Sequence, residues 1–147
     1  MKRSVSLIIS VLICGVFFMT GCDKQEPNLE GVENIIGCWV ANPESEYDAD
    51  SQKLILSYQK VKTLPTDSPS VKFLSDGTLI ERKNASWCGT PPITYGDFSG
   101  SWKIENDNDI KIDVTYWGGS EQKTWKIINI TGNTMKVEIN IGDIQYN

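Results

Sequence analysis

The sequence predicts an all-β fold, an eight-stranded antiparallel up-and-down barrel, over residues 35–147. From Ile35 onward, short apolar runs with a period of two residues recur about every ten residues, and turn residues separate them, as in all-β sandwiches and barrels. Strands joined by short turns pair with their neighbours in the chain, which makes a meander. Eight such strands close into a barrel that side chains fill or that holds one small ligand.

The predicted strands differ in how clearly they alternate. The clearest are 109–117, where Ile110, Ile112 and Val114 share one face, and 134–141. In 123–131 the apolar phase changes after Ile127, which indicates a bulge there or burial of both faces. The full set is 37–41, 53–61, 71–74, 78–82, 101–105, 109–117, 123–131 and 134–141.

The connections carry turn residues. Asp76-Gly77 lies between two predicted strands, and Gly77 is expected to take a positive φ. Residues 83–96 contain Pro91-Pro92, which cannot continue a ladder, so this segment is expected to be one long irregular connection at a working surface of the domain.

The first 22 residues have the pattern of an export signal. Lys2 and Arg3 precede an apolar run from Val5 to Met19, which is shorter than the roughly 20 residues that a membrane-spanning helix needs. Met19-Thr20-Gly21-Cys22 then resembles the lipobox of bacterial lipoproteins, although Met19 stands where that family usually has Leu. An ordinary signal peptide with an incidental cysteine, or an uncleaved anchor, is the alternative.

The resemblance implies a lipidated protein of the cell envelope. Residues 1–21 would be the signal peptide, and residues 22–34 the lipidated N-terminus and tether, with acyl chains on Cys22 inserted in the bilayer. The outer membrane is favoured over the inner one, and the leaflet is left open.

Composition argues against several classes of function. The net charge of −5, which becomes more negative once Lys2 and Arg3 are removed, disfavours nucleic acid as a partner. The chain contains no histidine, so it has no Ser-His or Cys-His pair and no histidine metal site. Alternating acids in 47–51 and 105–109 lack the glycine and distant glutamate of a calcium loop. We therefore expect no enzyme, no cofactor and no metal.

Two cysteines remain for the folded domain. In an oxidising compartment, Cys38 and Cys88 are best interpreted as a disulfide, with two separate buried thiols as the alternative. If Trp39 points into the barrel, strand alternation places Cys38 on the outside, where the 83–96 connection could bring Cys88 to it.

The order of several short motifs resembles a known family. Gly37-Cys38-Trp39 is followed by Phe73 and Asp76-Gly77-Thr78, then by Gly100-Ser101-Trp102, by a strand containing Trp125 and Ile127, and by a closing strand with Met135 and Val137. This resembles the lipocalin-like domains of bacterial lipoproteins, which are abundant in the Bacteroidetes. The resemblance implies a barrel that binds a small apolar or amphipathic ligand, with Trp39 and Trp102 packed as its floor.

Two functions follow as hypotheses. In the first, a hollow barrel holds the ligand; the candidate lining residues are Phe73, Trp102, Tyr116, Trp125 and Met135, with Trp87 and Trp117 at the rim. In the second, a filled barrel is a protein-interaction or envelope-structural module, and the 83–96 loop and exposed aromatic residues contact an envelope partner.

Overall fold

The computed structural model describes residues 34–44, 46–86 and 93–147. In this part of the chain the regular structure is β-strand, apart from single turns of 3-10 helix such as η2 (Ile141–Asp143). The strands are β1 (Gly37–Ala41), β2 (Glu46–Asp48), β3 (Lys53–Val61), β4 (Ser70–Phe73), β5 (Thr78–Asn84), β6 (Tyr95–Ile104), β7 (Asp109–Tyr116), β8 (Gly119–Thr131), β9 (Thr134–Asn140) and β10 (Gln145–Tyr146).

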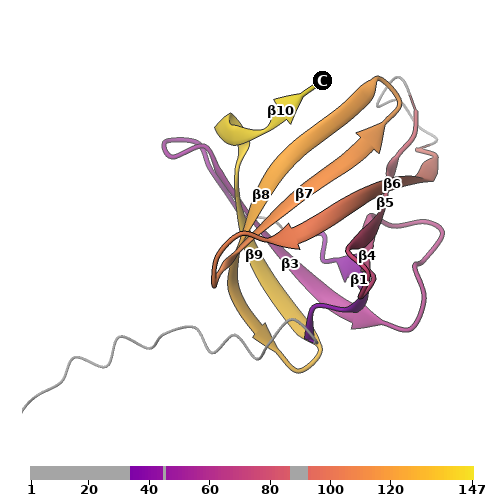
Figure 1. Cartoon of the computed structure of the whole chain (residues 1–147), viewed down its shortest axis with the longest axis horizontal. Helices are drawn as coiled ribbons and strands as arrows, with labels where there is room; N and C mark the ends of the chain where they lie inside the picture. The colour runs from indigo at the N-terminus through magenta and orange to yellow at the C-terminus, as the bar shows by residue number, and fades with distance from the viewer. Residues whose placement is uncertain (1–33, 45, 87–92) are drawn as a thin grey trace, which may run out of the picture.

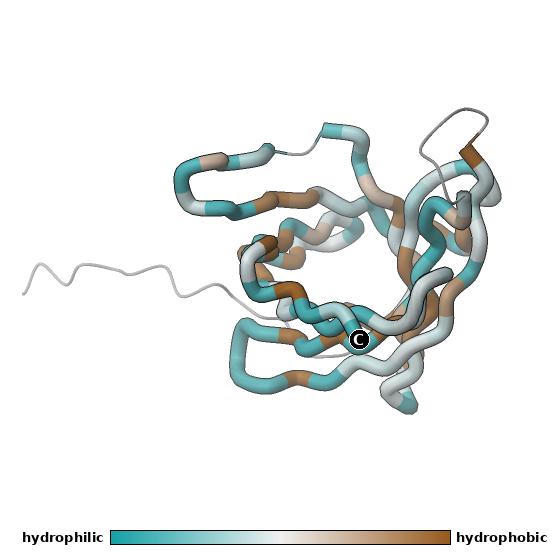
Figure 2. Tube along the Cα trace, turned by 90° about the horizontal axis from the view of Figure 1, so that it is seen from above, coloured by the Kyte–Doolittle hydropathy of each residue, from teal (hydrophilic) through white to brown (hydrophobic). Residues whose placement is uncertain are grey.

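Eight of these strands form a closed antiparallel barrel, as predicted. From β4 to β9 every strand pairs with the next one in the chain, which gives the meander visible in Figure 1. β3 closes the ring by pairing with β9 and with β1, and β1 also pairs with β4. β1 therefore lies between β3 and β4, the one departure from chain order in the ring. Viewed from above, the chain runs around a central axis (Figure 2).

Two short strands extend this ring. β2 pairs with the start of β3, and the hairpin that these two strands form extends beyond the barrel wall (Figure 1). β10 follows η2 and pairs with β8 at Gln122 and Glu121, beyond the point where β9 ends. The apolar alternation that predicts strands is absent from these two segments, so the sequence did not indicate them.

Alternation along the strands sets the core. In β7 the inward residues are Ile110, Ile112 and Val114. In β9 they are Met135, Val137 and Ile139, and all six are buried. The predicted bulge in β8 is confirmed: the register with β9 shifts between Ile127 and Asn129. This shift lets Ile130 point into the core although it is out of phase with Ile127.

The prediction of one long irregular connection at 83–96 is wrong at both of its ends. β5 continues to Asn84 and β6 begins at Tyr95, with Lys83 opposite Gly96 in the ladder. The inward positions here are charged or glycine, so the apolar alternation that marks a strand is missing although the backbone pairing continues. The Pro91-Pro92 tip lies outside the described residues.

Candidate functional site

One half of the barrel interior is filled by aromatic side chains. This closed half lies where β1 begins and β3 ends, and its inward residues include Trp39, Phe73 and Trp102. Trp39 is fully buried and its Nε1 donates to the Ile35 carbonyl oxygen at 2.7 Å. Trp102 Nε1 donates to the Leu74 carbonyl oxygen at 3.0 Å, and its ring meets Phe73 edge to face. Trp39 and Trp102 thus form the barrel floor, as the resemblance implied.

The opposite half contains inward residues that are not fully buried. Here β5 and β7 end and β3, β6 and β8 begin, so the β7–β8 turn lies at this end. Inward apolar residues that would be buried in a solid barrel, among them Leu54, Leu56 and Phe98, are only partly buried. Tyr116 is half-buried in the same way. We call this end, where inward side chains keep part of their surface exposed, the open half.

Four charged side chains lie inside the open half. Glu81 and Lys83 share the inward phase of β5 with Leu79, and Glu121 and Lys123 share that of β8 with Trp125. Lys123 Nζ lies 2.8 Å from Glu81 Oε1 and 2.8 Å from Glu121 Oε1; Lys83 Nζ lies 3.0 Å from Glu121 Oε1 and 3.3 Å from Glu81 Oε2. Because β6 and β7 separate β5 from β8, these side chains meet across the interior. We call them the ionic quartet.

The quartet favours the charged forms of two of its members, Glu121 and Lys123. The side chains of Lys123, Glu81 and Glu121 are 9%, 14% and 14% exposed. Burial alone would raise the pKa of Glu121, but attraction and hydrogen bonds from Lys123 and Lys83 outweigh it and lower that pKa. Burial likewise opposes the charge of Lys123, yet Glu81 and Glu121 raise its pKa above 10.5. On the opposite wall, burial and the negative charge of Glu81 raise the pKa of Tyr58.

Trp125 lies beside the quartet and has an unsatisfied donor. Its ring stacks on Tyr58 at 5.2 Å between centroids, and Lys123 Nζ lies 5.9 Å from the ring centroid. Its Nε1 is buried and finds no hydrogen-bond partner in the described part of the chain. A buried N–H without a partner is uncommon in native folds, so it points to a group that is supplied from elsewhere.

The structure places the five predicted lining residues in two groups. Phe73, Trp102, Trp125 and Met135 are all buried inside the barrel, and Phe73 contacts both tryptophans. Tyr116 lies apart from them at the open end, edge to face with Trp117 and Tyr146. Trp117 is 55% exposed in the β7–β8 turn. Whether these side chains contact a ligand stays a prediction.

Sequence reasoning missed the quartet. The signal was present, because counting back by twos from Trp125 reaches Lys123 and Glu121, and counting forward from Leu79 reaches Glu81 and Lys83. The predicted strands 78–82 and 123–131 contain Glu81 and Lys123 but leave out Lys83 and Glu121.

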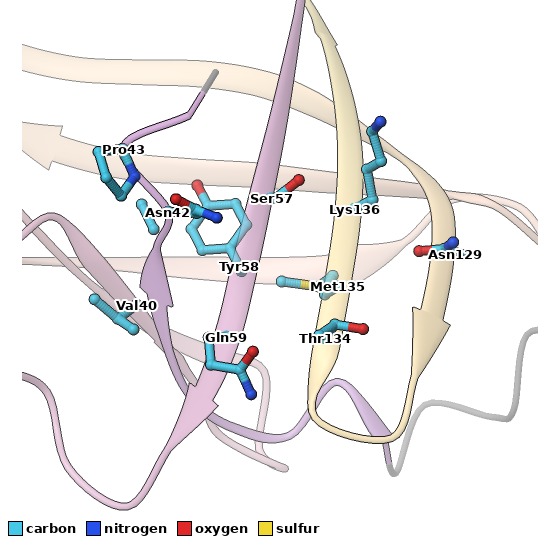
Figure 3. Close-up of a pocket in the computed structure, with 11 residues that line it drawn as sticks. Val40, Asn42, Pro43, Ser57, Tyr58, Gln59, Asn129, Thr134, Met135 and Lys136 are labelled. Carbon is cyan, nitrogen blue, oxygen red and sulfur yellow. The ribbon is translucent and has the colours of Figure 1, made fainter. Parts of the chain in front are cut away.

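A separate cavity lies on the outer wall. It has a volume of about 510 Å³, and its lining comes from β1 and the residues after it, β3, β8 and β9 (Figure 3). Ser57, Gln59 and Lys136 line it from the outward phase of their strands, whereas Tyr58 and Met135 belong to the core. We call it the outer groove. It combines apolar residues such as Val40 and Pro43 with polar ones such as Asn42 and Gln59, and these four are partly or fully exposed.

The cysteine predictions fall largely outside the described residues. Cys22, the signal segment and the tether up to residue 33 lie there, as do Trp87 and Cys88. Cys38 is a buried free thiol in this structure, outside the core cluster that contains Trp39. The Cys38–Cys88 disulfide therefore stays a prediction, which mass analysis of the non-reduced domain would test.

The acidic loops act as turns. In the β2–β3 loop, Asp48 accepts hydrogen bonds from the Asp50 backbone N–H and the Ser51 hydroxyl, which lower its pKa. Before β7, Asn106 accepts from the backbone N–H groups of Asn108 and Asp109. The described residues bring no three His, Cys, Asp or Glu side chains together as a metal site. No helix in this part is long and apolar enough to cross a membrane.

Comparison with known proteins agrees with this architecture. A family model described as a lipocalin-like domain matches residues 35–137. Fatty acid-binding protein type 3 of Fasciola hepatica is 24% identical over 123 residues, which cover 76% of this chain and 92% of the relative. No solved structure matches at a comparable level of significance.

Proposed function

Since this chain belongs to the lipocalin-like domain family, we propose that its barrel binds one small apolar or amphipathic molecule in the open half of its interior. The observation that carries this proposal is the partial burial of Leu54, Leu56 and Phe98, which point into the barrel. Aliphatic and aromatic walls with a few convergent polar groups are typical of small-molecule sites. The name of the fatty acid-binding relative supports the same class of ligand. No arrangement in the described residues favours a catalytic role over binding.

Two adjacent residues of β3 provide the test. Leu56 is inward and Ser57 lines the outer groove, so Leu56→Trp fills the interior while Ser57→Trp fills the groove. We expect Leu56→Trp to reduce affinity for a twelve-carbon amphiphile by about tenfold or more and Ser57→Trp to leave it unchanged, measured by calorimetry. Circular dichroism checks that both fold, and Leu54→Trp at the barrel mouth repeats the test. Undiminished binding by both interior variants would contradict the proposal.

The outer groove supports a second candidate function. Its volume of about 510 Å³ lies within the roughly 300–1,000 Å³ of ligand sites, and it combines apolar lining residues with polar side chains such as Ser57, Gln59 and Lys136. We propose it, independently of the interior site, as the surface for an envelope protein partner. Loss of partner binding in Ser57→Trp, with ligand binding intact, would support this reading; loss in Leu56→Trp alone would not.

The location of the domain is also a proposal. The lipobox-like Met19-Thr20-Gly21-Cys22 supports a chain that is anchored to the cell envelope by acyl chains on Cys22. The barrel would then present its site at a membrane surface, where amphipathic molecules are concentrated.

A further inference from the structure

The formal charges of the ionic quartet sum to zero. The ionic quartet contains two carboxylates and two ammonium groups, and each ammonium lies within 3.3 Å of both carboxylates. The four groups therefore neutralise one another before any ligand enters. A buried group of this kind offers no net attraction to an ion.

The neutrality of the quartet affects which polar head group of a bound amphiphile can be accommodated beside it. An anionic head placed beside the quartet would approach Glu81 and Glu121 as closely as it approaches the two lysines. A cationic head would meet Lys83 and Lys123 in the same way. In either case the incoming charge loses its hydration without gaining an uncompensated partner, and this cost is large in a buried site. An uncharged head avoids it.

The indole of Trp125 adds a specific requirement. Three tryptophans are buried in the described core, and two of their N–H groups bond to backbone carbonyls, those of Trp39 and Trp102. Only Trp125 Nε1 among them lacks an acceptor. An indole N–H donates one neutral hydrogen bond, which suits an ester, ether or hydroxyl oxygen. Because this nitrogen is shielded, the bond forms after the side chains around it shift slightly.

We propose that the ligand of this barrel is an uncharged amphiphile, such as an acylglycerol or a long-chain alcohol, whose head oxygen accepts a hydrogen bond from Trp125 Nε1 beside the neutral ionic quartet. This inference rests on the proposed function and deepens it.

Three ligands with the same twelve-carbon tail test the proposal on the full domain. These are 1-monolauroylglycerol, laurate and dodecyltrimethylammonium, titrated by calorimetry at pH 7.5 below their micelle concentrations. We expect the neutral ligand to bind about tenfold or more tightly than either ion. Laurate binding as tightly as monolauroylglycerol would overturn the inference and leave the proposed function standing. If none of the three binds, the proposed function itself fails.

Charge variants of the quartet give a second test. Glu81→Gln and Glu121→Gln each leave a net positive charge inside the barrel, so laurate should bind about tenfold more tightly than to the wild type. Lys83→Gln should instead favour dodecyltrimethylammonium. Glu105→Gln, which removes an exposed acid on the Lys111 ion pair, is the matched control and should change neither affinity. An unchanged laurate affinity in both folded glutamate variants would show that the head does not lie at the quartet.

The role of Trp125 is tested separately. Trp125→Phe keeps an aromatic ring and removes the donor, so it should weaken monolauroylglycerol binding while leaving dodecane binding nearly unchanged. Equal losses for both ligands would indicate a packing role for Trp125 and would contradict the proposed hydrogen bond.

Discussion

At the scale of single residues, the loss of one member of the ionic quartet should be costly. Removing one member of a buried ion pair leaves its partner uncompensated, which typically costs about 3–5 kcal/mol. Lys123 contacts both Glu81 and Glu121 and is 9% exposed. We expect Lys123→Met to lower the free energy of unfolding in urea by about 3 kcal/mol at pH 7. Lys111→Met, at a half-exposed pair of 4.0 Å with Glu105, should cost less than about 1 kcal/mol. Equal effects would contradict the buried quartet.

The quartet also predicts a pH dependence of stability. The pKa of Glu121 is lowered in the folded state, so its contribution is present above the ordinary value of 4.5 and is lost as the pH falls through the folded pKa. The pKa of Lys123 is raised, so its contribution is present below 10.5 and is lost as the pH rises through the folded pKa. Urea unfolding should show a stability plateau between these limits, and Glu121→Gln should flatten its acid side. A wild-type acid limb that is unchanged in Glu121→Gln would contradict this assignment.

At the scale of elements, β6 depends on Gly100. A Cβ there would collide with the Asp113 carbonyl oxygen and with the backbone of Val114 on β7. Gly132 has open space around it and a positive φ of 57°, so an alanine there meets only backbone strain. We expect Gly100→Ala to destabilise the domain by more than about 2 kcal/mol and Gly132→Ala by about 1 kcal/mol in urea unfolding. The reverse order would show that β6 and β7 are not held this closely.

Most of the strands could be predicted from the sequence. Strands with apolar alternation, such as Asp109–Tyr116 and Thr134–Asn140, were predicted nearly to the residue, and a bulge near Ile127 was one of the two alternatives for β8. The predicted strands end too early where the inward positions are charged or glycine, because a prediction from apolar and polar alternation assumes an apolar interior. That same departure marks the candidate site: Glu81, Lys83, Glu121 and Lys123 could be placed inside only once the register across β5 to β8 was known. The position of β1 between β3 and β4 depends on long-range pairing, which local patterns do not encode.

At the scale of the whole molecule, attachment to a membrane is separable from folding. The described core begins at Ile35, so replacing Cys22 should leave the barrel intact. We expect Cys22→Ser to remain exported, to fold with unchanged thermal stability, and to leave the membrane fraction. Retention of this variant in the membrane after a carbonate wash would contradict lipid anchoring.

The central claim is that the open half of the barrel receives an amphiphile beside Trp125. Each tryptophan indole gives its own ¹H–¹⁵N signal, so titration of the labelled domain with 1-monolauroylglycerol reports on each ring separately. We expect the Trp125 indole signal to shift until one equivalent of ligand is bound. The signals of Trp39 and Trp102, whose N–H groups bond to backbone in the closed half, should stay in place. A Trp125 signal that does not move at saturating ligand would contradict the account.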